Sequence, residues 1–332
     1  MNKIALSTVA FCLVLSVATA AEAAEYTLKV AHEAVGETNH VQLAWLEFKK
    51  EVEAKSGGRV EIKIFPGGQL GTDTQLVELT QDGAIDITCP TVSKLAGWDK
   101  AFSAPEIPYI FPNREVAMKV LKGDFGAFLD KRLEPMGLKR IGWFENGFRH
   151  TTNNVRPIVK PEDFKGIKLR TMPVDAHILV FSHLGANPTP MSFSELYSAL
   201  QQKVVDGQEN PLTNIVLNRM FEVQKYVSLT NHVYSTYIAL ANVDRYNALP
   251  EDIREIISTA MENSLAFQLA YIEKEEEKYL DSIKKAGVQV NALSPDQMKA
   301  FQDKIGEVEG KLSDMVGADA LKLLKDSVTA AK

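Results

Sequence analysis

Cysteine is almost absent from this chain of 332 residues, which contains Cys12 and Cys89 and no other thiol. Cys12 lies in an apolar segment typical of a cleaved export signal, so we expect only Cys89 in the mature chain. A single thiol cannot form an internal disulfide. The mature chain must therefore be held by its own apolar core. Because one core is near its limit at about 300 residues, we expect two domains.

An excess of positive charge and the common catalytic motifs are also missing. The net charge of −6 argues against nucleic acid or an anionic membrane as a partner. We find no zinc-binding H-E-x-x-H, no G-x-S-x-G and no Walker loop, and residues 67–71 lack the dinucleotide spacing. The histidines also lack metal-ligand spacing. The sequence therefore predicts no metal, no cofactor and no enzymatic activity.

The N-terminus predicts export. Lys3 precedes an apolar run over residues 4–17, and A-x-A cleavage sites follow at 18–20 and 21–23. The run is too short to cross a membrane, no later segment qualifies, and the residues before Cys12 form a poor lipidation signal. We predict a signal peptide over 1–23, cut between Ala20 and Ala24, and a periplasmic protein without a lipid anchor.

Hydrophobic periodicity predicts an α/β fold in two halves. Residues 59–65 alternate apolar and charged side chains, as a strand does, and Ser192 with Glu195 forms a capping box that opens a helix. We expect Trp45 and Trp143 in the core. The strands are predicted at 26–31, 59–65, 84–89, 138–144, 166–170 and 204–208. The helices are predicted at 41–52, 72–82, 114–122, 125–135, 174–184, 192–202 and 251–286. The first βαβαβ run implies a mostly parallel sheet.

The predicted helix at 251–286 is long enough to contact both domains. Its 36 residues would extend about 54 Å at 1.5 Å per residue. We therefore expect two lobes whose chain crosses between them more than once.

The segment 165–212 has the residues expected of a site for a small organic acid. Arg170 ends a predicted strand, Asn210 follows another, and Arg149 comes after the strand at 138–144. An arginine fork matches a carboxylate, and ligands of open α/β sheets bind beyond the carboxyl ends of strands. Structural alternatives remain for each residue: a surface arginine beside an acidic group, a crossover ion pair for Arg149, and a turn for Asn210.

At this point the chain resembles a known family. The segments KGIKLRT (165–171), LGANPTPMSFSELYSALQQKVVDGQENPL (184–212), FEVQKYVSLTNH (221–232) and LPEDIREII (249–257) are similar to those of the solute-binding proteins of tripartite ATP-independent periplasmic (TRAP) transporters. GQLG (68–71) and NGFRHTTN (146–153) agree as well. The resemblance covers about residues 26–315 and includes the C4-dicarboxylate and sugar-acid binding types.

The resemblance implies a periplasmic-binding-protein-like fold with two lobes, a central cleft, hinge crossovers and one long helix that spans both lobes. We assign 24–147 and about 235–272 to lobe I, and 148–234 and about 273–332 to lobe II. In the family, the arginine at the position of Arg170 pairs with the ligand carboxylate. The resemblance makes Arg149 a second anion contact and Asn210 a hydrogen-bond donor to the same carboxylate.

Further ligand contacts are implied by the same resemblance. Phe193 lines the cleft, while Glu33 and Thr91 occupy variable positions that touch the rest of the ligand, and Tyr237 and His150 are weaker candidates of this kind. In the sialic-acid-binding members of the family, the position of Thr91 is a glutamate. The absence of this glutamate here argues against sialic acid as the ligand. Arg170, Arg149 and Asn210 indicate a carboxylate but do not separate a C4-dicarboxylate from a uronate, an aldonate or a 2-oxo acid. Hydrogen-bonding groups at Glu33 and Thr91 favour a hydroxylated sugar acid among these.

The resemblance also implies the partners, namely the small and large membrane subunits of a TRAP permease, and we expect a monomer. Two alternatives stay open. A ligand-binding component of a periplasmic sensor system would have the same cleft. A periplasmic enzyme acting on organic acids would need an acid/base pair or an activated nucleophile, which we do not find.

Overall fold

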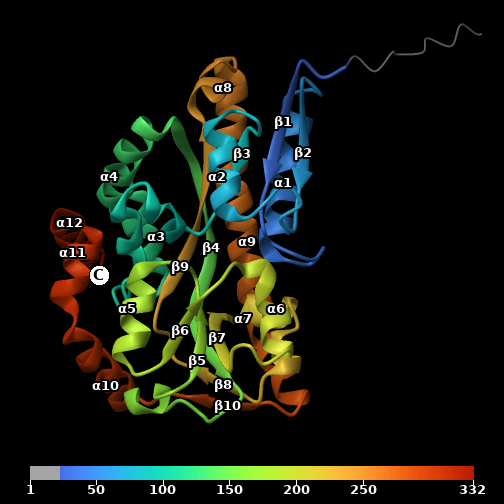
Figure 1. Ribbon diagram of the computed structural model, residues 1–332. Helices are drawn as coiled ribbons and strands as arrows, with labels where there is room; N and C mark the ends of the chain where they lie inside the picture. The colour runs from blue at the N-terminus through green and yellow to red at the C-terminus, as the bar shows by residue number, and fades with distance from the viewer. Residues whose placement is uncertain (1–22) are drawn as a thin grey trace, which may run out of the picture.

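The computed structural model describes residues 23–332, which form two lobes joined by elements that run between them (Figure 1). The first lobe contains β1 (Tyr26–Ala31), α1 (His40–Lys55), β2 (Val60–Phe65), α2 (Asp73–Gln81), β3 (Ile87–Thr88), α3 (Arg114–Lys122), α4 (Asp124–Leu133) and α8 (Val243–Asn247), with 3₁₀ turns η1 (Val92–Gly97), η2 (Lys100–Glu106) and η3 (Glu134–Met136). The mixed α/β fold and its two lobes are as the sequence predicts.

The second lobe contains the elements of residues 161–229 and 289–316. They are η4 (Pro161–Phe164), β5 (Lys168–Thr171), α5 (Asp175–His183), β6 (Asn187–Pro190), α6 (Phe193–Gln201), β7 (Gly207–Pro211), α7 (Leu212–Leu217), η5 (Met220–Val223), β8 (Tyr226–Leu229), β10 (Gln289–Ala292), α10 (Pro295–Gly306) and α11 (Glu309–Val316). The predicted capping box of Ser192 and Glu195 is present at the start of α6.

Strand β4 (Leu138–Asn153) belongs to the sheets of both lobes. It pairs antiparallel with β9 (Tyr234–Asn242) as far as Phe148, and with β7 and β8 beyond that point. The strand order is β2-β1-β3-β9-β4-β7-β5-β6, with β8 on β4 and β10 on β8. The sheet is therefore continuous from one lobe to the other, and the change of partner falls at Arg149.

Three strand predictions differ markedly from the structure. The strand predicted at 84–89 is reduced to β3 (Ile87–Thr88). The strand predicted at 138–144 continues to Asn153, because β9, β7 and β8 pair with it in turn. The strand predicted at 204–208 begins at Gly207. Lys203 adopts a left-handed φ of 60° that ends the preceding turn, and Val204 is 54% exposed on the loop. The predicted parallel pairing holds for β1 with β2 and β3, while β9 and β4 make the sheet mixed.

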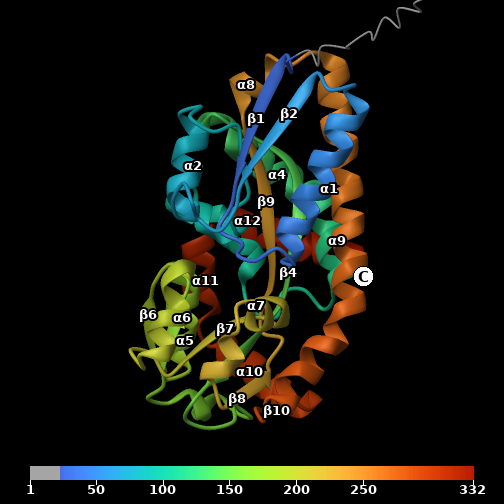
Figure 2. The same cartoon turned by 90° about the vertical axis from the view of Figure 1, so that its right-hand side faces the viewer.

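The long helix is present as α9 (Glu251–Lys285), with 35 residues. It packs beside α1 and β4 in the first lobe and beside α7 and β10 in the second (Figure 2). Ten of its side chains are buried, from Ile253 near one end to Ile283 near the other. The predicted contact with both lobes is confirmed, so α9 ties the lobes together along one side.

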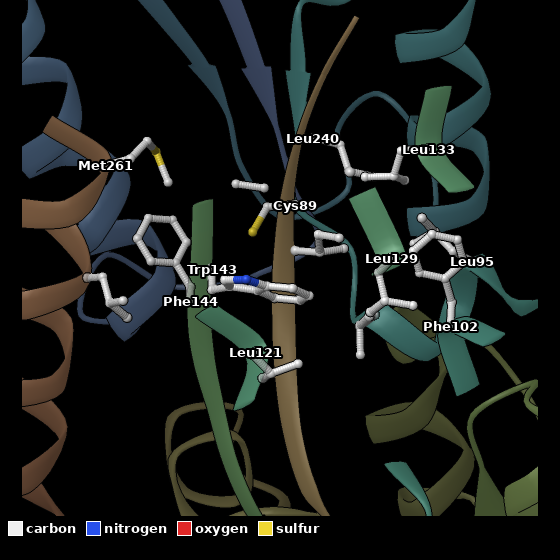
Figure 3. Packing of buried hydrophobic residues seen from close by; sticks show 14 of the residues in the cluster. Cys89, Leu95, Phe102, Leu121, Leu129, Leu133, Trp143, Phe144, Leu240 and Met261 are labelled. Atoms are coloured by element: carbon white, nitrogen blue, oxygen red, sulfur yellow. The ribbon is translucent and has the colours of Figure 1, made fainter. Parts of the chain in front are cut away.

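The apolar core is divided between the lobes. The largest cluster fills the first lobe, where Trp143 and Phe144 of β4 lie among side chains from β3, α3, α4, β9 and α9 (Figure 3). Trp45 packs edge-on against Phe48 and Phe144, with ring centroids 5.2 Å apart in both pairs. Two smaller clusters fill the second lobe. Trp45 and Trp143 are both buried, as predicted.

The C-terminal helix α12 (Ala318–Ala331) departs from the predicted lobe assignment. Its apolar face, with Ala320, Leu324 and Val328, joins the first-lobe cluster and packs against α3 and α4. The prediction placed all of 273–332 in lobe II, but after α11 the chain returns to lobe I and buries this face there. The remaining lobe boundaries stay predictions. The predicted signal peptide lies, except for its last residue, outside the described residues, and none of the helices in 23–332 is both long and apolar enough to span a membrane.

Candidate functional site

A polar cavity lies where the two lobes meet. Its lining residues come from both lobes: His32, Glu33, Ala34, Val41, Asp73, Cys89, Thr91 and Lys94 from the first, and Asn146, Arg149, Arg170, Met172, Phe193, Asn210, Asn214 and Tyr237 from the crossing strands and the second. The free space is about 30 Å³. Since one water needs about 10–15 Å³, an organic acid can enter only if the lobes move apart.

Arg170 is the penultimate residue of β5 and is buried at 1% exposure. Its Nε and Nη2 both donate to the carbonyl oxygen of Met191, at 3.1 and 2.8 Å. Its Nη1 is buried and has no hydrogen-bond partner among residues 23–332. The alternative of a surface arginine beside an acidic group is therefore wrong.

Burial lowers the pKa of Arg170 to about 10, and the nearby Arg149 acts in the same direction. The carboxylates of Glu209 and Glu33 oppose this effect. The guanidinium still keeps its charge at neutral pH. A buried cation with an unused donor is costly unless an anion reaches it, so Arg170 makes the cavity suited to an anionic group.

Arg149, in contrast, is already paired. Its Nε donates to Glu209 Oε2 at 2.5 Å, and its Nη2 donates to Glu209 Oε1 at 2.8 Å and to the Glu209 carbonyl at 2.6 Å. Burial alone would raise the pKa of Glu209, but Arg149 and His232 outweigh it and hold that pKa well below its usual range. The structural ion pair is thus present, and Nη1 is the Arg149 nitrogen that Glu209 does not use.

Asn210 belongs to a chain of buried side-chain amides. Its Nδ2 donates to Gln208 Oε1 at 2.5 Å, and its Oδ1 accepts from Asn214 Nδ2 at 3.3 Å. Asn214 also donates to Asn146 Oδ1 at 3.0 Å, and Asn146 donates to Ser235 Oγ at 3.1 Å. Each amide nitrogen has two hydrogens, so Asn210 keeps one for the cavity. Sequence reasoning missed Asn146 and Asn214, although Asn214, on α7, lies only four residues after Asn210 of β7.

The first-lobe wall carries a buried ionic triad. Lys94 Nζ of η1 donates to Glu33 Oε2 at 3.0 Å and to Asp73 Oδ2 at 2.7 Å, and all three side chains are at most 8% exposed. Burial and the neighbouring Asp73 raise the pKa of Glu33 to about 7, against the opposing effect of Lys94. Burial would lower the pKa of Lys94, but Asp73 and Glu33 outweigh it and raise that pKa. One ammonium therefore serves two carboxylates.

The remaining predicted contacts divide into two groups. Phe193, at the start of α6, Thr91, before η1, and Tyr237 of β9 all line the cavity, and Thr91 and Tyr237 form a β-bridge. His150 does not line it. Successive side chains of a strand point to opposite faces, so β4 directs Arg149 to the cavity and His150 away from it, where His150 accepts from the Asn231 backbone N–H at 3.4 Å.

The chemistry of this arrangement is that of binding. The cavity offers an unused guanidinium donor, amides, a hydroxyl and a paired ammonium on rigid elements. Within residues 23–332, no group of three or more His, Cys, Asp or Glu side chains is placed to hold a metal ion.

Comparison with known proteins also indicates a binding protein. The family described as bacterial extracellular solute-binding protein, family 7, matches residues 30–313. A C4-dicarboxylate-binding periplasmic protein DctP of Rhodobacter capsulatus is 31% identical over 318 residues, which cover 95% of this chain and 94% of the relative.

Two solved structures are similar along nearly the whole chain. The sugar-acid-binding protein DctPAm of Advenella mimigardefordensis, in complex with galactonate, has a TM-score of 0.89 at 32% identity, covering 94% of this chain and 100% of that one. A TRAP periplasmic solute-binding protein of Sulfurospirillum deleyianum with bound succinate has a TM-score of 0.86 at 30% identity, covering 93% and 100%. With the two-lobe fold and the interlobe cavity, these matches show that the chain belongs to the bacterial extracellular solute-binding proteins of family 7 and is a TRAP solute-binding protein for organic acids.

Proposed function

We propose that this protein captures an organic acid in the periplasm by clamping its carboxylate on Arg170, and delivers it to the small and large membrane subunits of a TRAP permease. The observation that carries the proposal is the buried Nη1 of Arg170, an unused donor on a charged group at the cavity. A carboxylate accepts from such a fork with both charge and geometry matched. The remaining N–H groups of Asn210 and Arg149 lie at the same cavity and would add to the clamp.

Binding in this proposal is coupled to movement of the lobes. The free space of about 30 Å³ is too small to admit the ligand, so the acid enters an open form. The lobes then close because the liganded closed state gains contacts from both walls. The signal peptide predicted over 1–23 and the family to which the chain belongs support the periplasmic location.

Replacing Arg170 tests the clamp. A thermal-shift screen over organic acids first finds a ligand, because a ligand bound only by the folded state raises the melting temperature. Removing one partner of a buried charge pair typically costs about 2–5 kcal/mol. We therefore expect Arg170→Ala to weaken binding in calorimetry by roughly 30-fold to several thousand-fold, at 1.4 kcal/mol per decade.

Two further variants sharpen the result. Arg170→Lys is expected to bind poorly as well, because an ammonium does not supply the planar fork. Arg219→Ala is the matched control, since Arg219 is an exposed arginine of the second lobe paired with Glu222 outside the cavity, and its affinity should equal that of the wild type. Near wild-type affinity in Arg170→Ala would refute the clamp.

A further inference from the structure

The charges along the cavity are distributed unequally between its two walls. On the second-lobe wall, Arg170 has the unused Nη1 donor, and Arg149 is held by Glu209. On the first-lobe wall, Lys94 is shared by Glu33 and Asp73, both of which also line the cavity. The first-lobe wall therefore has one positive charge and two carboxylates, and its ammonium is already committed to both of them.

This distribution fits a ligand that is charged at one end only. A second ligand carboxylate, placed away from Arg170, would meet Glu33 and Asp73 without a cation of its own to pair with. Like charges brought together in a site out of water repel strongly. The opposite wall thus penalises a dicarboxylate in a way that the Arg170 side does not.

The same wall suits hydroxyl groups. A hydroxyl both donates and accepts, so it can donate to Glu33 or Asp73 and accept from the third N–H of Lys94 or from the Thr91 hydroxyl. All four side chains line the cavity, and each is buried or nearly so. A polyhydroxylated chain would use these groups without adding charge.

From these contacts we infer that the Glu33–Lys94–Asp73 triad selects the ligand class, so that the protein binds polyhydroxylated monocarboxylates and rejects C4-dicarboxylates. This inference rests on the proposed capture of an acid by Arg170. Glu33 acts as a specificity-determining residue: its carboxylate receives ligand hydroxyls and repels a second ligand carboxylate.

Binding constants measured for the wild-type mature protein at pH 8 test the inference, because the Glu33 carboxyl, whose pKa is about 7, is then ionised. One panel contains aldonates and uronates, including galactonate, and the other contains succinate and fumarate. We expect the tightest sugar acid to bind at least about tenfold more tightly than either dicarboxylate.

The Glu33→Gln variant then tests the contribution of the Glu33 negative charge alone. The amide keeps the size of the side chain and an oxygen that accepts from Lys94, but it removes the repulsion. We expect the preference for the sugar acid to narrow by about tenfold or more, mainly through tighter dicarboxylate binding. Asp73→Asn should act in the same direction. Glu37→Gln, on the exposed part of the same loop, is the control and should leave the preference unchanged.

The outcomes separate the two proposals. If a dicarboxylate binds at least as tightly as every sugar acid, and Arg170→Ala abolishes that binding, the selectivity inference is overturned and the clamp stands. An unchanged preference in both Glu33→Gln and Asp73→Asn also overturns the selectivity inference. If acids of either panel bind and Arg170→Ala leaves their affinity unchanged, the clamp fails, and the inference fails with it.

Discussion

Arg149 and Arg170 are both buried arginines at the second-lobe side of the cavity, but they are satisfied in different ways. Arg149 has a carboxylate partner, whereas Arg170 has only a backbone carbonyl oxygen among the residues that the structure describes. Loss of Arg149 leaves the Glu209 carboxylate buried without its main counter-charge. Loss of Arg170 leaves one carbonyl without a donor. The two residues therefore differ in what they contribute to folding and to binding.

Arg149→Ala is expected to destabilise the folded protein strongly. Breaking a buried ion pair by removing one partner typically costs about 3–5 kcal/mol, because the remaining charge is uncompensated. Urea unfolding of the variant should show this loss in the free energy of unfolding, whereas Arg170→Ala should lose much less. Adding Glu209→Gln to Arg149→Ala removes the stranded charge and should recover part of the stability. Equal stability of the two arginine variants would contradict the argument.

The roles of single residues could be predicted where one sequence segment carries them, but not where the fold brings distant segments together. Arg170, Phe193 and Asn210 lie in one stretch that carries the family resemblance, and all three line the cavity. Lys94 and Asp73 could not be inferred, because their roles arise from the meeting of η1 with the start of α2, which no local pattern encodes. The ion pair of Arg149 was an alternative reading in the sequence, but its partner Glu209 was not identified.

At the scale of elements, strand β4 positions the site because it pairs with different strands along its length. In its pairing with β7, Arg149 lies opposite Pro211, and the next residue, His150, lies opposite Asn210. The register of these two strands therefore determines the positions of Arg149 and Asn210. The sequence predicted the start of β4, all of α3 and, from a stretch without proline or glycine, all of α9. It did not predict the extension of β4, because pairing with distant strands decides it. The prediction for His150 was wrong for the same reason. Because β4 extends past His150, the alternation of side chains along the strand directs His150 away from the cavity.

Gly207 tests the importance of this register. It pairs with Asn153, and a Cβ added at Gly207 would lie 2.2 Å from the Thr152 carbonyl oxygen and 2.7 Å from Asn153 Cβ. Backbone atoms cannot move aside without a large cost in free energy, so Gly207→Ala must push β7 away from β4. We expect a loss of about 1–3 kcal/mol or more in the free energy of unfolding, with weaker ligand binding.

A glycine in open surroundings supplies the control for this variant. Gly306 ends α10, and an added Cβ there would meet no atom within 4 Å. Gly306→Ala should therefore be neutral or stabilising by up to about 1 kcal/mol, since alanine favours the helix and restricts the unfolded chain. Urea unfolding and calorimetry of both variants give the comparison. A fully stable Gly207→Ala with normal affinity would show that the β4–β7 register is not what positions the site.

At the scale of the whole molecule, the two lobes also touch through ionisable groups that do not line the cavity. Glu106, at the end of η2 in the first lobe, lies 3.2 Å from His177 Nε2 on α5 of the second lobe, and it accepts from Ser93 and Ser235. His177 Nδ1 is 4.0 Å from Glu209 Oε1. Burial would raise the pKa of Glu106, but His177 and Arg149 outweigh it and lower that pKa. The imidazole thus lies between carboxylates of both lobes.

This contact should contribute to closure without touching the ligand. Separation of the lobes breaks the Glu106–His177 pair, so its free energy adds to that of the ligand contacts in the closed state. The Glu106–His177 pair is a close electrostatic contact in which the His177 ring nitrogens make no hydrogen bond within residues 23–332. We expect its loss in His177→Leu to weaken ligand affinity by roughly 10- to 100-fold, or about 1.4–2.8 kcal/mol. The change should appear mainly as faster ligand dissociation in stopped-flow measurements, because the open form that meets the ligand lacks the contact.

His183→Leu is the matched control for His177→Leu. His183 lies on the same helix, but it pairs with Glu307 and the Lys304 carbonyl within the second lobe. Its loss should therefore leave the ligand dissociation rate unchanged. If His177→Leu folds and releases the ligand at the wild-type rate, closure does not draw on this pair, and the ligand contacts alone hold the lobes together.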